Sequence, residues 1–171
     1  MEIPIRNGET RHGDMETAMN MTQINKEPEL PTYLNYNKLI FHEDLWPDVV
    51  GRTLLIDFKR GELELRAIEG IWSCRITFAE GIAFKSRLEL SHIADWGEEY
   101  HPPVGAMVLD GNAWYLKLYK GRKLLKETHG CNGLPPGQQW NVFYSVITRS
   151  YNFALARGQA RPDESMERPC F

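Results

Sequence analysis

Apolar and polar residues alternate along the middle of the chain with a period of two, which is the pattern of β-strands. The clearest predicted strand is the stretch 82–91 (IAFKSRLELS). One of its faces carries Ile82, Phe84, Leu88 and Leu90, and the other carries Lys85, Arg87 and Glu89. The same period runs through residues 54–58, 63–67, 71–79 and 114–118. Such alternation predicts an antiparallel sheet with one covered face and one solvated face.

Short pairs that end in glycine punctuate these runs. They are Arg60-Gly61, Glu69-Gly70, Glu80-Gly81, Asp110-Gly111 and Lys120-Gly121. Glycine in such a pair permits the backbone of a tight hairpin turn. No helical crossover fits between the runs, so we expect consecutive strands to pair as a β-meander.

One long helix is predicted in residues 138–158 (QQWNVFYSVITRSYNFALARG). Most of its apolar residues fall on one stripe, and Gly158 is a natural end. The stripe consists of Trp140, Phe143, Tyr144, Ile147, Tyr151, Ala154 and Leu155, while Val142, Val146 and Phe153 form a second, narrower ridge. The expected fold class is therefore α+β: an antiparallel meander of five to seven strands, covered on one face by this single C-terminal helix. We expect a flexible N-terminal arm (1–32), one α+β domain (33–158) and a disordered C-terminal tail (159–171).

Composition and charge narrow the function classes. The net charge of -3 gives no general attraction to nucleic acid or to an anionic membrane, so neither is expected as a partner. No signal-peptide pattern and no run of about eighteen apolar residues occurs, which predicts a cytoplasmic protein. The three cysteines have none of the paired spacings of zinc or redox motifs, so we expect free thiols and no cofactor.

The stretch 128–140 (THGCNGLPPGQQW) has two interpretations. His129 lies two residues before Cys131 and is a candidate base for a reactive thiolate. The glycines and Pro135-Pro136 also suit a corner that leads from a strand into the predicted helix. We favour the corner, because catalytic cysteine and histidine normally come from separate parts of a chain.

Two groups of residues suit a metal-dependent hydrolase or nuclease. Pro47-Asp48, followed by Asp57 and Lys59, matches in letters a nuclease pattern whose carboxylates bind Mg²⁺. The alternation of Asp57 and Lys59 with apolar neighbours also explains both as solvent-facing strand residues. The second group lies in the long connection 91–105, whose spacings match no established metal motif: His92, Asp95, Glu98, Glu99 and His101.

Residues 110–147 resemble the C-terminal part of small, uncharacterised bacterial proteins. The resemblance rests on an Asp-Gly-x-x-Trp strand and a Gly-x-Asn-x-x-Pro corner before a helix. The matching residues are Asp110, Gly111, Trp114, Gly130, Asn132 and Pro135. The resemblance implies a bacterial source and a strand, a corner and a helix in this order. It implies no known activity.

A binding protein is the function that these observations favour, since no catalytic site is evident. Aromatic side chains are common anchors of interfaces, and they occur both in the connection 91–105 and on the predicted solvated face of the sheet. The candidate binding residues are His92, Asp95, Trp96, Tyr100, His101, Tyr115 and Tyr119. We expect the partner to be another protein. The alternatives are the hydrolase or nuclease described above, and a subunit of a phage or secretion assembly.

Overall fold

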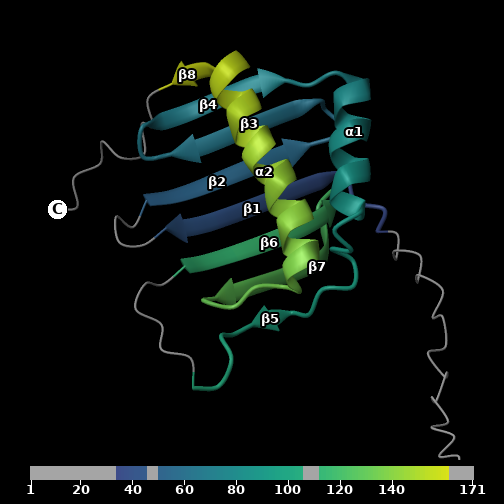
Figure 1. Ribbon diagram of the computed structural model, residues 1–171. Helices are drawn as coiled ribbons and strands as arrows, with labels where there is room; N and C mark the ends of the chain where they lie inside the picture. Colours follow the sequence, from purple (N-terminus) through teal and green to yellow (C-terminus); the bar gives the residue numbers. More distant parts are fainter. Residues whose placement is uncertain (1–33, 46–49, 106–111, 162–171) are drawn as a thin grey trace, which may run out of the picture.

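One sheet of eight strands is the framework of the described part of the chain (Figure 1). The computed structural model describes residues 34–45, 50–105 and 112–161; the predicted arm, the end of the predicted tail and Asp48 lie outside these ranges. The elements are β1 (Lys38–Leu45), β2 (Val50–Asp57), β3 (Glu62–Ala67), β4 (Gly70–Arg75), α1 (Phe78–Glu89), β5 (Glu99–Tyr100), β6 (Asn112–Lys120), β7 (Lys123–Cys131), α2 (Gly137–Arg157) and β8 (Gln159–Arg161).

The strand order in the sheet is β5-β7-β6-β1-β2-β3-β4-β8. Strands β1 to β4 form an antiparallel meander. The chain then passes through α1 and returns at β6, which pairs antiparallel with the other edge of β1 and so places β1 inside the sheet. Strand β7 follows β6 antiparallel, β5 adds to β7 in parallel, and β8 adds to β4. Strand β8 lies in the stretch that the sequence predicted to be a disordered tail.

Helix α2 crosses one face of the sheet, and α1 runs along one end of the strands (Figure 1). The core lies between α2 and the sheet, because alternate strand residues point toward the helix. Its fully buried residues include Leu39, Phe41, Leu54, Ile56, Leu63, Leu116 and Leu118 of the sheet, and Phe143, Ile147 and Ala154 of α2. The α+β class, the largely antiparallel sheet and the long C-terminal helix are confirmed. The sheet has eight strands rather than five to seven, and it is not one continuous meander, because α1 lies between β4 and β5 and a second helix is therefore present.

The predicted strand over residues 82–91 is wrong, because Phe78–Glu89 forms helix α1. The helix begins with a capping box: the Thr77 side chain accepts from the Glu80 backbone N–H, and the Glu80 carboxylate accepts from the Thr77 N–H at 2.7 Å. Lys85, Arg87 and Glu89 therefore belong to this helix and not to the solvated face of the sheet. The predicted strand over 71–79 ends at Arg75 for the same reason, and Phe78 is 85% exposed.

Three of the glycine pairs lie at turns of the sheet, as predicted: Arg60-Gly61, Glu69-Gly70 and Lys120-Gly121. Asp110-Gly111 lies outside the described residues, and the turn predicted at Glu80-Gly81 is wrong. Gly61 and Gly121 have φ angles of 64° and 61° in the turns between β2 and β3 and between β6 and β7. The Glu80-Gly81 pair lies inside α1, where Gly81 is buried and a methyl group would make ordinary van der Waals contacts. A carbon at the Cβ position of Gly81 would lie 3.8 Å from both Ile76 and Phe58.

Candidate functional site

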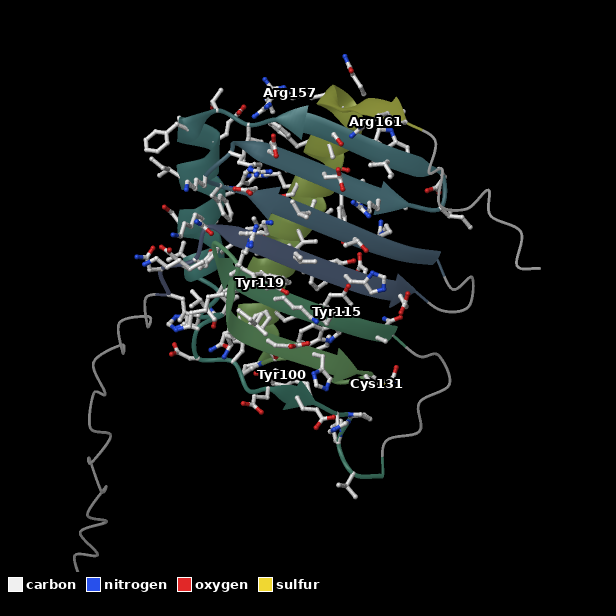
Figure 2. The ribbon with its side chains drawn as sticks, turned by 180° about the vertical axis from the view of Figure 1, so that it is seen from behind. Tyr100, Tyr115, Tyr119, Cys131, Arg157 and Arg161 are labelled. Carbon is white, nitrogen blue, oxygen red and sulfur yellow. The ribbon has the colours of Figure 1, made fainter. Side chains whose placement is uncertain are left out.

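The face of the sheet turned away from α2 is covered by no other element of the described residues (Figure 2). We call it the open face. Strand alternation places aromatic, aliphatic and charged side chains on it together, and most are half-buried by their neighbours in the sheet. At its centre are Lys38, Ile40, His42, Leu55, Tyr115, Lys117 and Tyr119.

His42 is held in place at the centre of the open face by neighbours on three strands. Its Nδ1 lies 2.8 Å from the hydroxyl of Thr53, and its Nε2 lies 3.1 Å from Oδ1 of Asp44. The imidazole stacks on the ring of Tyr115, with centroids 5.0 Å apart and planes at 20°. Gly51 leaves room for this arrangement, because a Cβ there would lie only 2.9 Å from Asp44 Oδ1.

Tyr115 also lies beneath a charged side chain of its own strand. The ammonium of Lys117 lies 5.3 Å from the Tyr115 ring centroid and 2.9 Å from a carboxylate oxygen of Glu127 on β7. The hydrogen bond with Glu127 raises the pKa of Lys117 above its usual value. The ring of Tyr115 is therefore fixed by contacts on two sides.

A hollow of about 780 Å³ lies on the part of the open face formed by β2, β3, β4 and β8, and Lys38 of β1 and Arg157 of α2 also line it. We call it the basic hollow. Cations outnumber carboxylates among its lining side chains, although the whole chain has a net charge of -3. The charged residues that line it are Lys38, Arg60, Arg66, Arg75, Arg157 and Arg161, together with Asp57, Glu62 and Glu64.

The carboxylates of the basic hollow neutralise only some of its cations. Arg66 lies 2.7 Å from Glu64, and Arg75 lies 3.3 Å from Glu62. Within the described residues Lys38 has no carboxylate partner, and neither has Arg161, whose guanidinium donates to the Ser73 hydroxyl at 2.9 Å. Arg157 and Arg161 lie at the β8 edge of the hollow (Figure 2). The hollow thus has positive charge available for an anionic group.

Two of the predicted binding residues, Tyr115 and Tyr119, lie on the open face (Figure 2). Tyr100 lies at the margin of the sheet on β5, where its hydroxyl accepts from the backbone N–H of Gly97 at 2.8 Å. Its ring contacts Trp114 on the core side, with centroids 6.0 Å apart. The structure thus brings Tyr115 and Tyr119 together on one surface and separates Tyr100 from them.

The predicted residues of the connection 91–105 form local contacts. His92, with a φ of 55°, and Asp95 lie in the turns after α1, their side chains 3.5 Å apart. Trp96 is 3% exposed and donates from Nε1 to the Ser91 carbonyl at 3.0 Å. A partner on the surface would not reach Trp96, so we leave it out of the candidate surface.

The carboxylate of Glu99 joins two histidines at the β5 edge. It lies 3.0 Å from Nε2 of His101 and 3.4 Å from Nε2 of His129. Among the residues that the structure describes, no cluster of three or more such groups has a geometry that could hold a metal ion. Glu99, His101 and His129 form an exposed ion-pair network.

Asp57 and Lys59 do not form the metal site that the nuclease pattern would require, because the Asp57 carboxylate is used in a turn. Asp57 Oδ1 accepts from the backbone N–H of Lys59 at 3.1 Å and of Arg60 at 3.0 Å, which closes the turn after β2. Lys59 is exposed beside this turn. Asp48, the remaining member of the nuclease pattern, lies outside the described residues.

The stretch 128–140 is a corner between β7 and α2, as we predicted. Gly130 is required there, because a Cβ would lie 2.3 Å from the Gly133 carbonyl oxygen and 2.4 Å from the Trp114 indole nitrogen. Asn132 has a φ of 57°, and its side-chain oxygen accepts from the Asn112 N–H at 2.7 Å. Cys131 is exposed on the same side of β7 as His129, whose nearest ion-pair partner is Glu99.

Sequence reasoning missed most of the open face. Residues 38–45 were not assigned to a strand, although Leu39 and Phe41 alternate with Lys38 and His42. Glu43 at the next core-facing position interrupted that pattern. The register of β1 with β2 and β6, which creates the open face, becomes visible only when non-consecutive strands are paired.

A scan against protein-family models and a comparison with curated proteins gave no match for this sequence. Neither helix of the described residues combines the length and the apolar character needed to cross a membrane.

Proposed function

We propose that this chain is a non-enzymatic binding protein that recognises an acidic segment of another protein on the open face. One observation carries the proposal. The open face combines half-buried aromatic and aliphatic side chains with the positive charge of the basic hollow, and no described element covers it. Tyrosine and arginine are enriched in protein interfaces, where a mixed surface of this kind is common.

The central side chains of the open face can contact a partner without changing their conformation. Tyr115 is fixed between His42 and Lys117, so its ring loses little conformational freedom when a partner packs on it. Ile40 and Leu55, half-buried beside it, provide apolar surface. Binding at this centre would bury apolar area at a low cost in side-chain entropy.

The positive charge of the basic hollow favours a partner segment with acidic side chains. Lys38 lies at the β1 end of the hollow and Arg161 at the β8 end, and no described carboxylate neutralises either of them. Aspartate or glutamate side chains of a bound segment would complement both positions. We therefore expect the affinity to fall as salt screens these charges.

The test compares the full-length protein with variants of the open face. Partner proteins are captured from the native host with the wild-type chain, identified, purified and titrated by calorimetry. We expect Lys38→Glu combined with Arg161→Glu, and separately Tyr119→Ala, each to weaken binding by at least about tenfold. Arg149→Glu is the matched control, because Arg149 is exposed on α2, away from the open face. Equal affinities for all four proteins would refute the proposal.

A further inference from the structure

The side of α1 that faces away from the rest of the molecule is largely apolar. The helix packs on the core through Gly81, Phe84 and Leu88. Its other side includes one charged residue, the half-buried Glu89, which falls between Phe78 and Ile82 around the helix. That side combines large apolar residues with small ones. Its exposed residues are Phe78, Ala79, Ile82, Ala83, Ser86 and Leu90. We call this surface the outer α1 face. Exposed apolar surface of this kind is typical of an interaction site.

The charges along one edge of the outer α1 face are self-complementary. Glu80 and Arg87 are seven residues apart, nearly two full turns, so they lie along the same edge of the helix. When a second α1 packs antiparallel about a two-fold axis, Arg87 of each copy lies opposite Glu80 of the other. In a parallel arrangement this edge of one copy would instead lie beside the opposite edge of the other copy, so Glu80 and Arg87 would not meet. The charges along this edge therefore favour antiparallel packing of α1 against α1 of a second copy.

Glu80 can accept a second guanidinium. One carboxylate oxygen accepts from Thr77, and the other accepts from Nη1 of Arg157 at 2.8 Å. A carboxylate has about four acceptor positions, and the side chain of Glu80 remains partly exposed. Arg87 is exposed, so its side chain is accessible to a second copy.

The same antiparallel register matches large side chains with suitable neighbours. Phe78 of one copy lies near Leu90 of the other, and Ile82 lies near Ser86. Ala79 and Ala83 between them allow the two helices to approach closely. The shape and the charge of the outer α1 face thus indicate one arrangement.

We propose that the chain forms a homodimer in which two copies of α1 pack antiparallel through the outer α1 face. The proposal does not rest on the proposed function, because none of these residues belongs to the open face. A single helix of this length buries less area than a standard protein interface. We therefore expect a weak dimer, with a dissociation constant on the order of micromolar or higher.

Sedimentation equilibrium of the full-length chain tests the proposal over concentrations from about 1 µM to about 500 µM. The average mass of the wild type is expected to rise from the 19.8 kDa of one chain toward twice that mass. Ile82→Lys is expected to weaken dimerisation by at least about tenfold. Ile68→Lys is the matched control, because Ile68 is also an exposed isoleucine but lies in the turn between β3 and β4. It should dimerise as the wild type does.

Arg87→Glu tests the antiparallel register separately, because it places a carboxylate opposite Glu80 of the other copy. We expect at least about tenfold weaker dimerisation. A wild-type chain that stays monomeric at the highest concentration would overturn the proposal. The proposal would also fail if the Ile82→Lys variant dimerised as strongly as the Ile68→Lys variant. If Ile82→Lys instead made residues 1–33 sensitive to protease in a monomeric protein, the N-terminal segment would be the occupant of the outer α1 face and the proposal would be wrong.

Discussion

At the scale of single residues, the most informative group is a partly buried ion pair beneath α2. Glu43 is 5% exposed and accepts from Arg52 at 2.8 Å and from the hydroxyl of Tyr151 at 3.0 Å. The guanidinium of Arg52 also lies over the Tyr151 ring, 4.8 Å from its centroid. A buried charge is tolerated only when its partners replace water. The three side chains therefore connect β1, β2 and α2 through one polar contact.

Replacing Tyr151 by Phe is expected to lower the free energy of unfolding by about 1 kcal/mol at pH 8, because one hydrogen bond to buried Glu43 is lost. Burial, together with the nearby Glu43 carboxylate, raises the pKa of Tyr151 far above its usual value. The folded state thus keeps the proton that the unfolded state releases above about pH 10. The contribution of Tyr151 is complete below that pH and falls as the pH rises further.

Urea unfolding at pH 8 and at pH 11 checks this prediction. The stability difference between the wild type and Tyr151→Phe should shrink at the higher pH. Tyr119→Phe is the control, since Tyr119 is a half-buried tyrosine of the open face, and it should differ little from the wild type at pH 8. A difference that stayed constant or grew with pH would count against this account of Tyr151.

At the scale of elements, the corner between β7 and α2 depends on close backbone contacts. We expect Gly130→Ala to lower the free energy of unfolding by at least about 3 kcal/mol, because backbone and the Trp114 ring would have to move to admit the methyl group. Gly137→Ala is the control: nothing lies within 4 Å of its Cβ position at the start of α2. Denaturant unfolding measures both. A mild effect of Gly130→Ala would show that the corner adapts easily.

Helix α1 depends on its capping box for a defined start. We expect Thr77→Ala to cost about 1 kcal/mol, because the N–H of Glu80 loses its acceptor. Thr148→Ala, at an exposed position of α2, should have little effect. Thermal unfolding compares the two variants. Equal melting temperatures would mean that tertiary packing alone fixes the start of α1.

The sequence correctly predicted those elements whose pattern of apolar residues fits only one kind of secondary structure. Leu54 and Ile56, or Leu116 and Leu118, fit only a strand, and both pairs are fully buried in the sheet. Phe84 and Leu88 fit the spacing of a strand and of a helix equally well. The capping pair Thr77 and Glu80 was the local signal for the helix.

The candidate site was harder to predict than the core. Tyr115 and Tyr119 were assigned to the solvated face from alternation alone, and they lie there. Their neighbours His42 and Lys38 come from β1, and Arg161, at the far edge of the open face, comes from β8. No local pattern contains the pairing of β1 with β6, so the open face and the basic hollow could not be derived from the sequence.

At the scale of the whole molecule, the two faces of the sheet differ in what packs on them. One face and α2 enclose the apolar core, which accounts for the fold. The open face contributes little to that core, so substitutions there should change binding more than stability. For Lys38→Glu combined with Arg161→Glu we expect an unfolding free energy within about 0.5 kcal/mol of the wild type. A larger loss in urea unfolding would show that the basic hollow serves the fold.

Site-specific photo-crosslinking in the native host tests the central claim most directly. A photoreactive phenylalanine analogue is placed either at Tyr119 on the open face or at Asn152, an exposed position of α2. We predict a defined crosslink to another protein from position 119, lost when Lys38→Glu and Arg161→Glu are added, and none from position 152. The same crosslinked protein from both positions, or none from position 119, would contradict the claim that the open face is the binding surface.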